Sequence, residues 1–281
     1  MTRAADGRTL NVDPSPPEMS ARPTIALLTD FGRQDHYVGV MKGVIAGRCP
    51  SATLIDITHD VRPQDVATAA YELAVAAPYF PPRTVFLVVV DPGVGTARPA
   101  IAAQVGRRRF VGPDNGVFDL VFRREAPSRA VQLFEAARLP EAVGRTFDGR
   151  DLFAPVAAAL ALGAKVESVG RPVVVRPRLE WPMPSRSADG LVGEVIHVDR
   201  FGNLVTNISG QDVGAAWGKA EVIVAGVGPV RVVTTYGDGG VGELVALLNS
   251  ADRLEIAVSS GEAASRFVTT RGAAVRVRWP T

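Results

Sequence analysis

The chain has 281 residues, of which 47% are hydrophobic and 21% charged, enough to bury the core of one large or two modest domains. The formal net charge is only +2 and the basic residues are scattered, which argues against a nucleic-acid-binding surface. The single cysteine, Cys49, excludes an internal disulfide and a multi-cysteine zinc site. No run of about 18 apolar residues and no signal-peptide pattern is present, so we expect a cytoplasmic protein without membrane partners.

The first part of the chain combines a leader with an alternation of strands and helices. Residues 1–22 are rich in proline and poor in apolar residues, which predicts a flexible leader. Strands separated by helices predict an α/β domain over residues 23–180 with a mainly parallel sheet. The expected elements are a strand at 24–29, a helix at 37–47, a strand at 53–57, a helix at 63–77, a strand at 84–90, a hairpin within 100–111 and an alanine-rich helix at 152–162.

The second part of the chain has a different texture. Prolines become frequent after residue 170, and short alternating segments follow. We expect a linker at residues 181–190 and a smaller all-β domain at 191–281, with strands spaced as in a small sandwich or barrel. These strands are predicted at 193–198, 220–225, 230–235, 244–248, 253–258 and 274–279.

The most informative segment follows the apolar run at residues 84–90. This β-branched run is typical of a strand buried on both faces, and Asp91 stands where the strand ends. In open α/β sheets ligands bind at the carboxyl ends of strands. The glycines after Asp91 allow a tight turn that would fold Arg98 back toward it. An ordinary Asp-Pro-Gly turn is the alternative interpretation.

Carboxylates also mark two other element ends. Asp30 follows the first predicted strand, where it can accept hydrogen bonds from a ribose diol. Alternatively, Asp30 or Asp35 caps the next helix. Near the helix predicted at 152–162, Asp151 is expected to be the cap, while Asp148 and Arg150 face the crevice.

Several common catalytic motifs are missing. No glycine-rich dinucleotide or phosphate loop, no G-x-S-x-G and no H-E-x-x-H occurs, which disfavours nucleotide-cofactor redox and serine-hydrolase chemistry. The three histidines, including His59, lack metal-ligand spacing, and His59 is either a proton carrier or a structural residue. The carboxylates could still hold a hard cation, so metal-assisted hydrolysis stays open at this point.

Seven segments in order resemble the S-adenosylmethionine hydrolases of the adenosine-forming type, a family similar in fold to the S-adenosylmethionine-dependent fluorinase and chlorinase. They are residues 28–32 (LTDFG), 37–43 (YVGVMKG), 55–59 (IDITH), 90–98 (VDPGVGTAR), 113–116 (PDNG), 147–155 (FDGRDLFAP) and 199–207 (DRFGNLVTN). The resemblance runs from about residue 24 to 279. It implies an α/β domain followed by a β domain, and a homotrimer with sites between subunits. It also implies attack of water or hydroxide at C5′ of S-adenosylmethionine, giving adenosine and methionine without a metal or redox cofactor.

The resemblance places Asp91 and Arg98 in a catalytic group of three whose third member is a histidine. The family's Phe-His-Gly-Arg-Asp is Phe-Asp-Gly-Arg-Asp here, so the third member is Asp148. We expect Arg98 to lower the pKa of Asp91 and help it orient water. Asp148 can accept a proton or pair with Arg98, so activity either survives with a changed pH profile or is lost. If Asp91 and Asp148 approach closely, their titrations couple.

The substrate contacts also carry over by motif. The resemblance implies that Asp30 holds the ribose hydroxyls. Phe201 lies among polar groups in a segment that suits a bound aromatic ring or a zwitterion; a plain polar turn is the alternative interpretation. The aromatic that relatives place beside the ribose is Gln64 here, and the arginine that follows the serine in the halogenases is Ala251. For the rest, the resemblance assigns the methionine end to Asp199 and Ser250, and the adenine to Asn203, Tyr236 and the backbone near Ser260.

Three functions remain open on the sequence. Hydrolysis is favoured because Asp91 and Arg98 are charged where the halogenases carry uncharged residues, and a carboxylate beside C5′ repels halide. Halogenation of S-adenosylmethionine is the second. Non-catalytic binding of adenosine or S-adenosylmethionine is the third, because Asp148 replaces the expected histidine.

Overall fold

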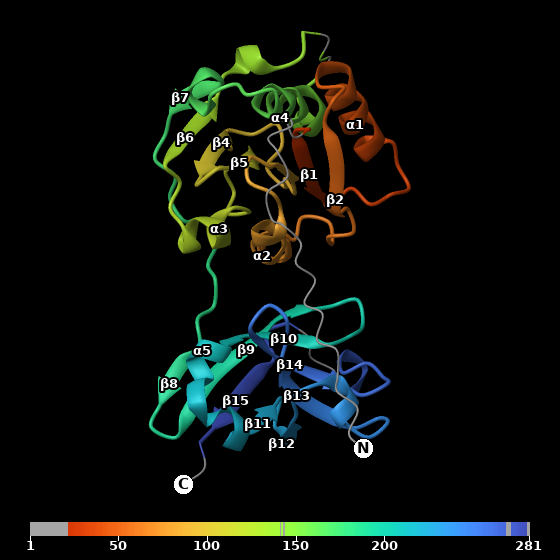
Figure 1. Cartoon of the computed structure of the whole chain (residues 1–281), viewed down its shortest axis with the longest axis vertical. Coiled ribbons are helices and arrows are strands. Elements are labelled where there is room, and N and C mark those ends of the chain that lie inside the picture. Colours follow the sequence, from red (N-terminus) through yellow and green to blue (C-terminus); the bar gives the residue numbers. More distant parts are fainter. Residues whose placement is uncertain (1–21, 141, 143, 268–270, 280–281) are drawn as a thin grey trace, which may run out of the picture.

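The computed structural model describes residues 22–279 except 141, 143 and 268–270. The predicted leader, apart from Arg22, therefore lies outside the described residues. Figure 1 shows a region of helices around a sheet, followed along the chain by a separate region of strands. The segment after β7 (Gly170–Pro172) connects the two regions.

The sheet of the first region is mixed. Its strands run in the order β2-β1-β3-β5-β4-β6-β7, and only the pairs β2–β1, β1–β3 and β3–β5 are parallel. The prediction of a mainly parallel sheet is therefore wrong. The predicted hairpin does form, and because it inserts β4 antiparallel to β5, the strands beyond it also pair antiparallel. The strands are β1 (Thr24–Thr29), β2 (Thr53–Thr58), β3 (Val85–Val89), β4 (Ala100–Val105), β5 (Arg108–Pro113), β6 (Arg129–Leu133) and β7.

Helices cover both faces of this sheet. Side chains of α1 and α4 share one hydrophobic core with the sheet, whereas α2 and α3 belong to a second core on the opposite face. The helices are α1 (Tyr37–Arg48), α2 (Val66–Ala76), α3 (Asp119–Arg124) and α4 (Ala154–Ala161), with a π-helical turn at Gly149–Phe153 directly before α4 and 3-10 turns at Ala77–Tyr79, Glu135–Ala137 and Val166–Ser168.

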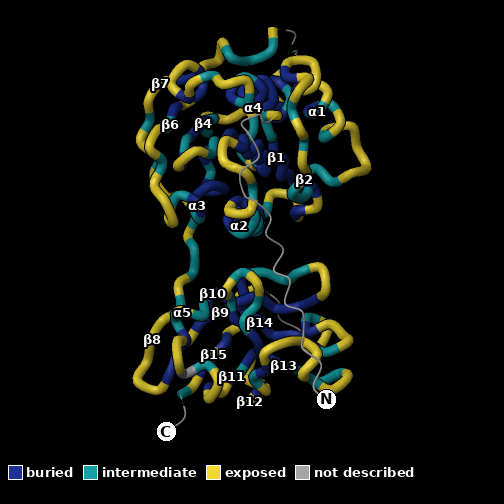
Figure 2. The backbone as a smooth tube through the Cα atoms, in the orientation of Figure 1, coloured by how far each residue is buried: buried dark blue, intermediate teal, exposed yellow. Residues whose placement is uncertain are grey.

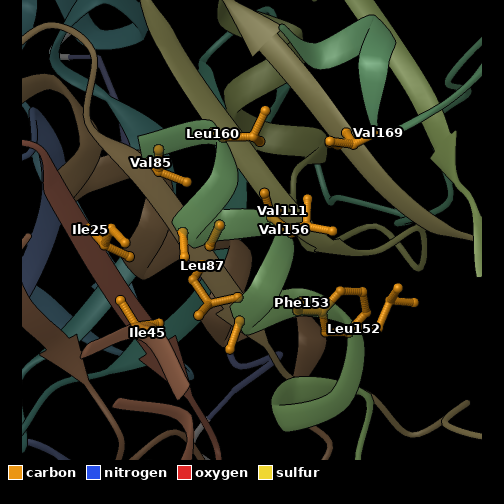
Figure 3. Packing of buried hydrophobic residues seen from close by; sticks show 14 of the residues in the cluster. Ile25, Ile45, Val85, Leu87, Val111, Leu152, Phe153, Val156, Leu160 and Val169 are labelled. Carbon is orange, nitrogen blue, oxygen red and sulfur yellow. The ribbon is translucent and has the colours of Figure 1, made fainter. Parts of the chain in front are cut away.

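Strand β3 lies at the centre of both cores. Val85 and Leu87 point into the core beside α1 and α4, while Phe86 and Val88 point into the core beside α2. Figure 3 shows Val85 and Leu87 packed among other apolar side chains of the first core. Because both faces of β3 are buried, an uninterrupted apolar run is what this strand requires, as predicted.

Two helix starts differ from the predictions. Helix α2 begins at Val66 rather than residue 63, because Gln64 has a φ of 67° and Asp65 caps the helix by accepting from the Thr68 amide at 3.0 Å. Asp151 does not cap the later helix. It lies in the π-helical turn, is 1% exposed, and accepts a hydrogen bond from Arg150 Nε at 2.6 Å. The predicted cap at Asp151 is therefore wrong.

The second region is a β-barrel. Its sheet runs β10-β14-β13-β12-β11-β15-β9-β8, and pairing of β9 with β10 closes the ring and leaves β8 outside it. The strands are β8 (Ser185–Ser187), β9 (Gly190–Val198), β10 (Leu204–Ser209), β11 (Glu221–Val224), β12 (Val227–Val232), β13 (Leu244–Leu248), β14 (Arg253–Val258) and β15 (Ala274–Arg278). One short helix, α5 (Gly210–Val213), and 3-10 turns at Gly214–Lys219, Tyr236–Asp238 and Ala264–Arg266 complete it.

One barrel strand, β10, has no counterpart among the predicted strands. Its Thr206 and Asn207 are buried, and polar residues at such positions hide the alternation that marks a strand. The predicted linker at 181–190 contains β8, which pairs with β9.

The two regions touch through α2. Tyr71 of α2 packs with Ile196 and Val205 of the barrel, and Glu72 Oε1 lies 3.2 Å from His197 Nε2. Figure 2 shows α4 as largely buried and many of the connecting loops as exposed. Among the helices of the described residues, none is long and apolar enough to cross a membrane.

Candidate active site

Two carboxylates, those of Asp30 and Asp91, lie just beyond the ends of neighbouring strands. Thr29 of β1 pairs with Val89 of β3, so Asp30 and Asp91 follow neighbouring parallel strands at the same edge. A cavity of about 360 Å³ opens at this edge. Its lining includes three acidic and three aromatic residues: Asp30, Asp91, Asp148, Phe31, Tyr37 and Phe147. We call it the sheet-edge cavity.

The turn after Asp91 brings Arg98 back onto it, as predicted. Gly95 takes a φ of 78°, which a residue with a side chain rarely adopts, and Thr96 Oγ1 donates to the Gly93 carbonyl at 2.7 Å. Arg98 Nε donates to Asp91 Oδ1 at 2.9 Å, and Arg98 Nη2 donates to the other carboxylate oxygen. The result is a two-point contact with a planar fit that lysine could not make.

Asp148 joins the same guanidinium. Arg98 Nη2 lies 3.0 Å from Asp148 Oδ2, so one cation bridges the two carboxylates. The side chains of Asp91, Arg98 and Asp148 are between 5% and 10% exposed, and the Arg98 guanidinium lies 5.6 Å from the centre of the Phe153 ring. A second arginine, Arg138, donates from Nη2 to Asp148 Oδ1 at 2.8 Å.

Burial controls the titration of Asp91. Removal from water raises the pKa of Asp91 above its ordinary value, the charge and hydrogen bonds of Arg98 oppose that rise, and the charge of Asp148 adds to it. Arg98 therefore lowers the pKa of Asp91 as expected, but burial outweighs it and the net direction is upward. The sequence could not weigh burial against the ion pair.

Asp30 is half-buried and anchored from the loop before α2. The amide of Gln64 donates to Asp30 Oδ2 at 2.7 Å, and burial raises the pKa of Asp30 while this hydrogen bond lowers it. Helix α1 begins after His36 without a side-chain cap, so neither Asp30 nor Asp35 performs the alternative capping role.

The predicted substrate residues of the barrel gather in a second cavity of about 870 Å³, which we call the barrel cavity. Asp199 organises its rim, since its Oδ1 accepts from the amides of Phe201 and Asn203 at 2.8 Å each. Phe201 is 73% exposed there. The cavity is lined by all six predicted barrel residues, Asp199, Phe201, Asn203, Tyr236, Ser250 and Ser260, and by Tyr71 and Glu72 of α2.

Sequence reasoning missed Glu255 in this cavity. Glu255 is 2% exposed, and it accepts hydrogen bonds from Tyr236 Oη at 2.6 Å and from Asn249 Nδ2 at 2.9 Å. Burial raises the pKa of Glu255, which the two hydrogen bonds partly offset. The sequence feature that could have identified Glu255 is its position as a single carboxylate within the apolar run of β14. Arg138 was also missed, and nothing in its local sequence distinguishes it.

The sheet-edge and barrel cavities are separate in one chain. Among the residues that the structure describes, no side chain lines both. The same described part of the chain holds no group of three or more His, Cys, Asp and Glu side chains arranged to bind a metal ion. The predicted residues thus form two groups, one in each region.

Comparisons with known proteins give one family-domain match in each region. The family model of the SAM hydroxide adenosyltransferase N-terminal domain matches residues 25–170, and that of the C-terminal domain matches residues 193–276. A Thermus thermophilus protein named (R)-S-adenosyl-L-methionine hydrolase is 43% identical over 260 residues, covering 90% of this chain and 98% of that protein.

Two further likenesses extend the comparison. A Nocardia brasiliensis fluorinase is 30% identical over 291 residues, covering 92% of this chain and 97% of its own. The crystal structure of an uncharacterised conserved protein from Thermotoga maritima superposes with a TM-score of 0.84 at 38% identity, covering 90% of this chain and 99% of that one. From the domain matches and these identities, the chain belongs to the SAM hydroxide adenosyltransferase family.

Proposed function

We propose that this protein hydrolyses S-adenosyl-L-methionine to adenosine and L-methionine. The observation that carries the proposal is the pair of carboxylates, Asp91 and Asp148, bridged by Arg98 in the sheet-edge cavity that also holds Asp30. Membership of the family and the name of the Thermus thermophilus relative support the choice of substrate.

The reaction requires little assistance from the protein at the sulfur atom. The oxygen of water attacks C5′, the C5′–S bond breaks, and its electron pair stays on sulfur, which leaves as the neutral thioether of methionine. The attacking water loses one proton to solvent, so the products are adenosine, methionine and a proton. Because the sulfonium is a good leaving group, positioning of the water is the main requirement, and near-attack geometry can supply about 7–11 kcal/mol.

Asp91 and Arg98 are suited to that positioning. The ionised Asp91 accepts a hydrogen bond from water, and the Arg98 guanidinium stabilises the negative charge that develops on the attacking oxygen. Because both oxygens of Asp91 already accept from Arg98, we infer that Asp91 orients the water rather than removing its proton fully. The negative charge of the ionised Asp91 also repels halide, which disfavours the halogenase alternative.

The two cavities divide the substrate. We infer that Asp30, fixed by the Gln64 amide, accepts from the ribose hydroxyls in the sheet-edge cavity. In the barrel cavity, Asn203, Tyr236 and the backbone near Ser260 surround adenine, with the exposed ring of Phe201 beside it. Asp199 and Ser250 hold the methionine end.

Because one substrate needs both groups, we infer a homotrimer in which the sheet-edge cavity of one copy faces the barrel cavity of another. Separate inactive variants, Asp91→Ala in one cavity and Asn203→Ala in the other, test this arrangement. Copies mixed during expression should regain activity, because some sites then combine two intact cavities. Mixtures as inactive as the separate variants would place the whole site in one chain.

Product analysis tests the chemistry itself. The protein is incubated with S-adenosylmethionine, and nucleosides are separated by chromatography, with Asp91→Ala as the control. Release of adenosine that depends on Asp91 supports the proposal, whereas a halogenated nucleoside in chloride or fluoride would replace it with halogenation. Tight binding without adenosine release would favour the non-catalytic alternative.

We also infer that the reaction proceeds in the cytoplasm without a metal or redox cofactor. Water, substrate and the charged groups of the sheet-edge cavity account for every bond made and broken. Dialysis against a chelator should leave the rate unchanged, and loss of activity restored by a divalent cation would revive metal-assisted hydrolysis.

A further inference from the structure

Asp148 is held by two arginines from different parts of the chain. Arg98, in the turn after β3, binds Asp148 Oδ2 at 3.0 Å. Arg138, the residue after the 3-10 turn at Glu135–Ala137, binds Asp148 Oδ1 at 2.8 Å. Arg138 is itself fixed, because its Nε donates to Glu135 Oε1 at 2.7 Å. The Arg138 side chain is only 13% exposed, so its charge is poorly screened by water.

Counting charges shows what Arg138 changes. Asp91 and Asp148 around Arg98 alone would leave one surplus negative charge in a mostly buried cluster. Arg138 cancels it. A buried charge without a partner either destabilises the fold or loses its ionisation. Each oxygen of Asp148 accepts a hydrogen bond from a different arginine, which fixes the orientation of the carboxylate.

We propose that Arg138 is a positioning residue for the hydrolytic site: it holds Asp148 in the orientation in which Asp148 anchors Arg98 against Asp91. The inference rests on the proposed function. At the position where the family resemblance implies a histidine, this chain carries Asp148 paired with Arg138.

The test compares Arg138→Met with Arg145→Met. Arg145 also reaches Glu135, at 3.3 Å, but it is 70% exposed and touches neither carboxylate of the site. Loss of a hydrogen bond to a charged group predicts a fall in kcat of roughly tenfold to a hundredfold for Arg138→Met, with a smaller change in KM. Arg138→Lys should recover part of the loss, and Arg145→Met should match the unmodified protein.

Two further readouts separate positioning from a purely structural role. The charged and titratable groups that face Asp91 are Arg98 on its own turn, Asp148 with Arg138 behind it, and Asp30 across the cavity. Arg138→Met leaves Asp148 uncompensated, so the pKa of Asp91 rises further and the acid limb of the rate moves to higher pH. Adding Asp148→Asn removes the surplus charge while keeping an acceptor for Arg98, and should restore part of the rate.

If Arg138 only stabilises its loop, Arg138→Met should lower the rate by the same factor at every pH, and Asp148→Asn should not restore it. That result would overturn the inference. Titration of the Asp91 carboxyl carbon by nuclear magnetic resonance needs no turnover. It should show a higher midpoint in Arg138→Met than in the unmodified protein, and an unchanged midpoint refutes the inference. If the unmodified protein releases no adenosine, the proposed function fails, while this titration still decides the role of Arg138.

Discussion

Replacing Arg98 by methionine should destabilise the protein in a strongly pH-dependent way. Arg98 is 10% exposed, donates twice to Asp91 and once to Asp148, and lies over Phe153. Removing one partner of a buried ion pair costs about 3–5 kcal/mol, because the remaining charges lose their compensation. Asp91 loses its arginine here, whereas Asp148 keeps Arg138, so we expect a loss in that range at about pH 8.

The pH dependence follows from the direction of the Asp91 shift. Burial and Asp148 raise the pKa of Asp91, and Arg98 opposes them, so the variant raises it further. A carboxyl whose pKa is raised in the folded state contributes stability that is fully present below its unfolded pKa of about 3.9 and is lost as pH rises through the folded value. The deficit of Arg98→Met should therefore be small at about pH 4 and largest at neutral and alkaline pH.

Urea unfolding of both proteins at several pH values measures this deficit. Arg33→Met is the matched control, because Arg33 pairs with Asp60 at 3.6 Å with both side chains well exposed, and such pairs contribute about 0–1 kcal/mol. A loss for Arg98→Met that is independent of pH, or no larger than that of the control, would refute the charge argument.

Three further outcomes follow from the site and the core. Asp91→Asn should lower kcat by about a hundredfold or more in steady-state product assays, and an unchanged kcat would exclude Asp91 from the water site. The acid limb of kcat/KM should lie above the ordinary aspartate range near 3.9, since burial raises the pKa of Asp91 and the ionised form is needed; a limb at or below that range would contradict it. Leu87→Ala should cost about 2–5 kcal/mol in urea unfolding because Leu87 is fully buried, while kcat at low temperature stays near that of the unmodified protein; a cost under about 1 kcal/mol would show that the site collapses around the cavity.

The sequence predicted best where local chemistry decides the structure. The apolar run of β3 and the turn glycines before Arg98 each require the conformation that they adopt, so strand, turn and ion pair could be foreseen. The mixed sheet could not, because the pairing partners of β4 and β6 depend on contacts distant in sequence. The hairpin itself was visible, but its effect on the direction of the later strands was not.

Some features of the candidate sites depend on the tertiary structure and could not be predicted from the sequence. Arg138 and Asp148 are 10 residues apart in the sequence, and no periodicity marks the contact between them. The pKa of Asp91 depends on the balance between burial and charge, which needs coordinates. The cavities could be assigned in advance only through resemblance to a family, and their separation within one chain was visible only in the structure.

The double burial of β3 has a consequence for folding fidelity. Because both faces of β3 are apolar, a slip of one residue relative to the neighbouring strands would still place apolar side chains in both cores. The polarity of the side chains would therefore do little to prevent such a slip. Such a slip would also carry Asp91 about 3.3 Å along the sheet and turn it to the opposite side, away from Arg98. Because Arg98 is also held by Asp148, its contact with Asp91 opposes such a slip, and the residue that we expect to hold the reacting water also follows the end of β3.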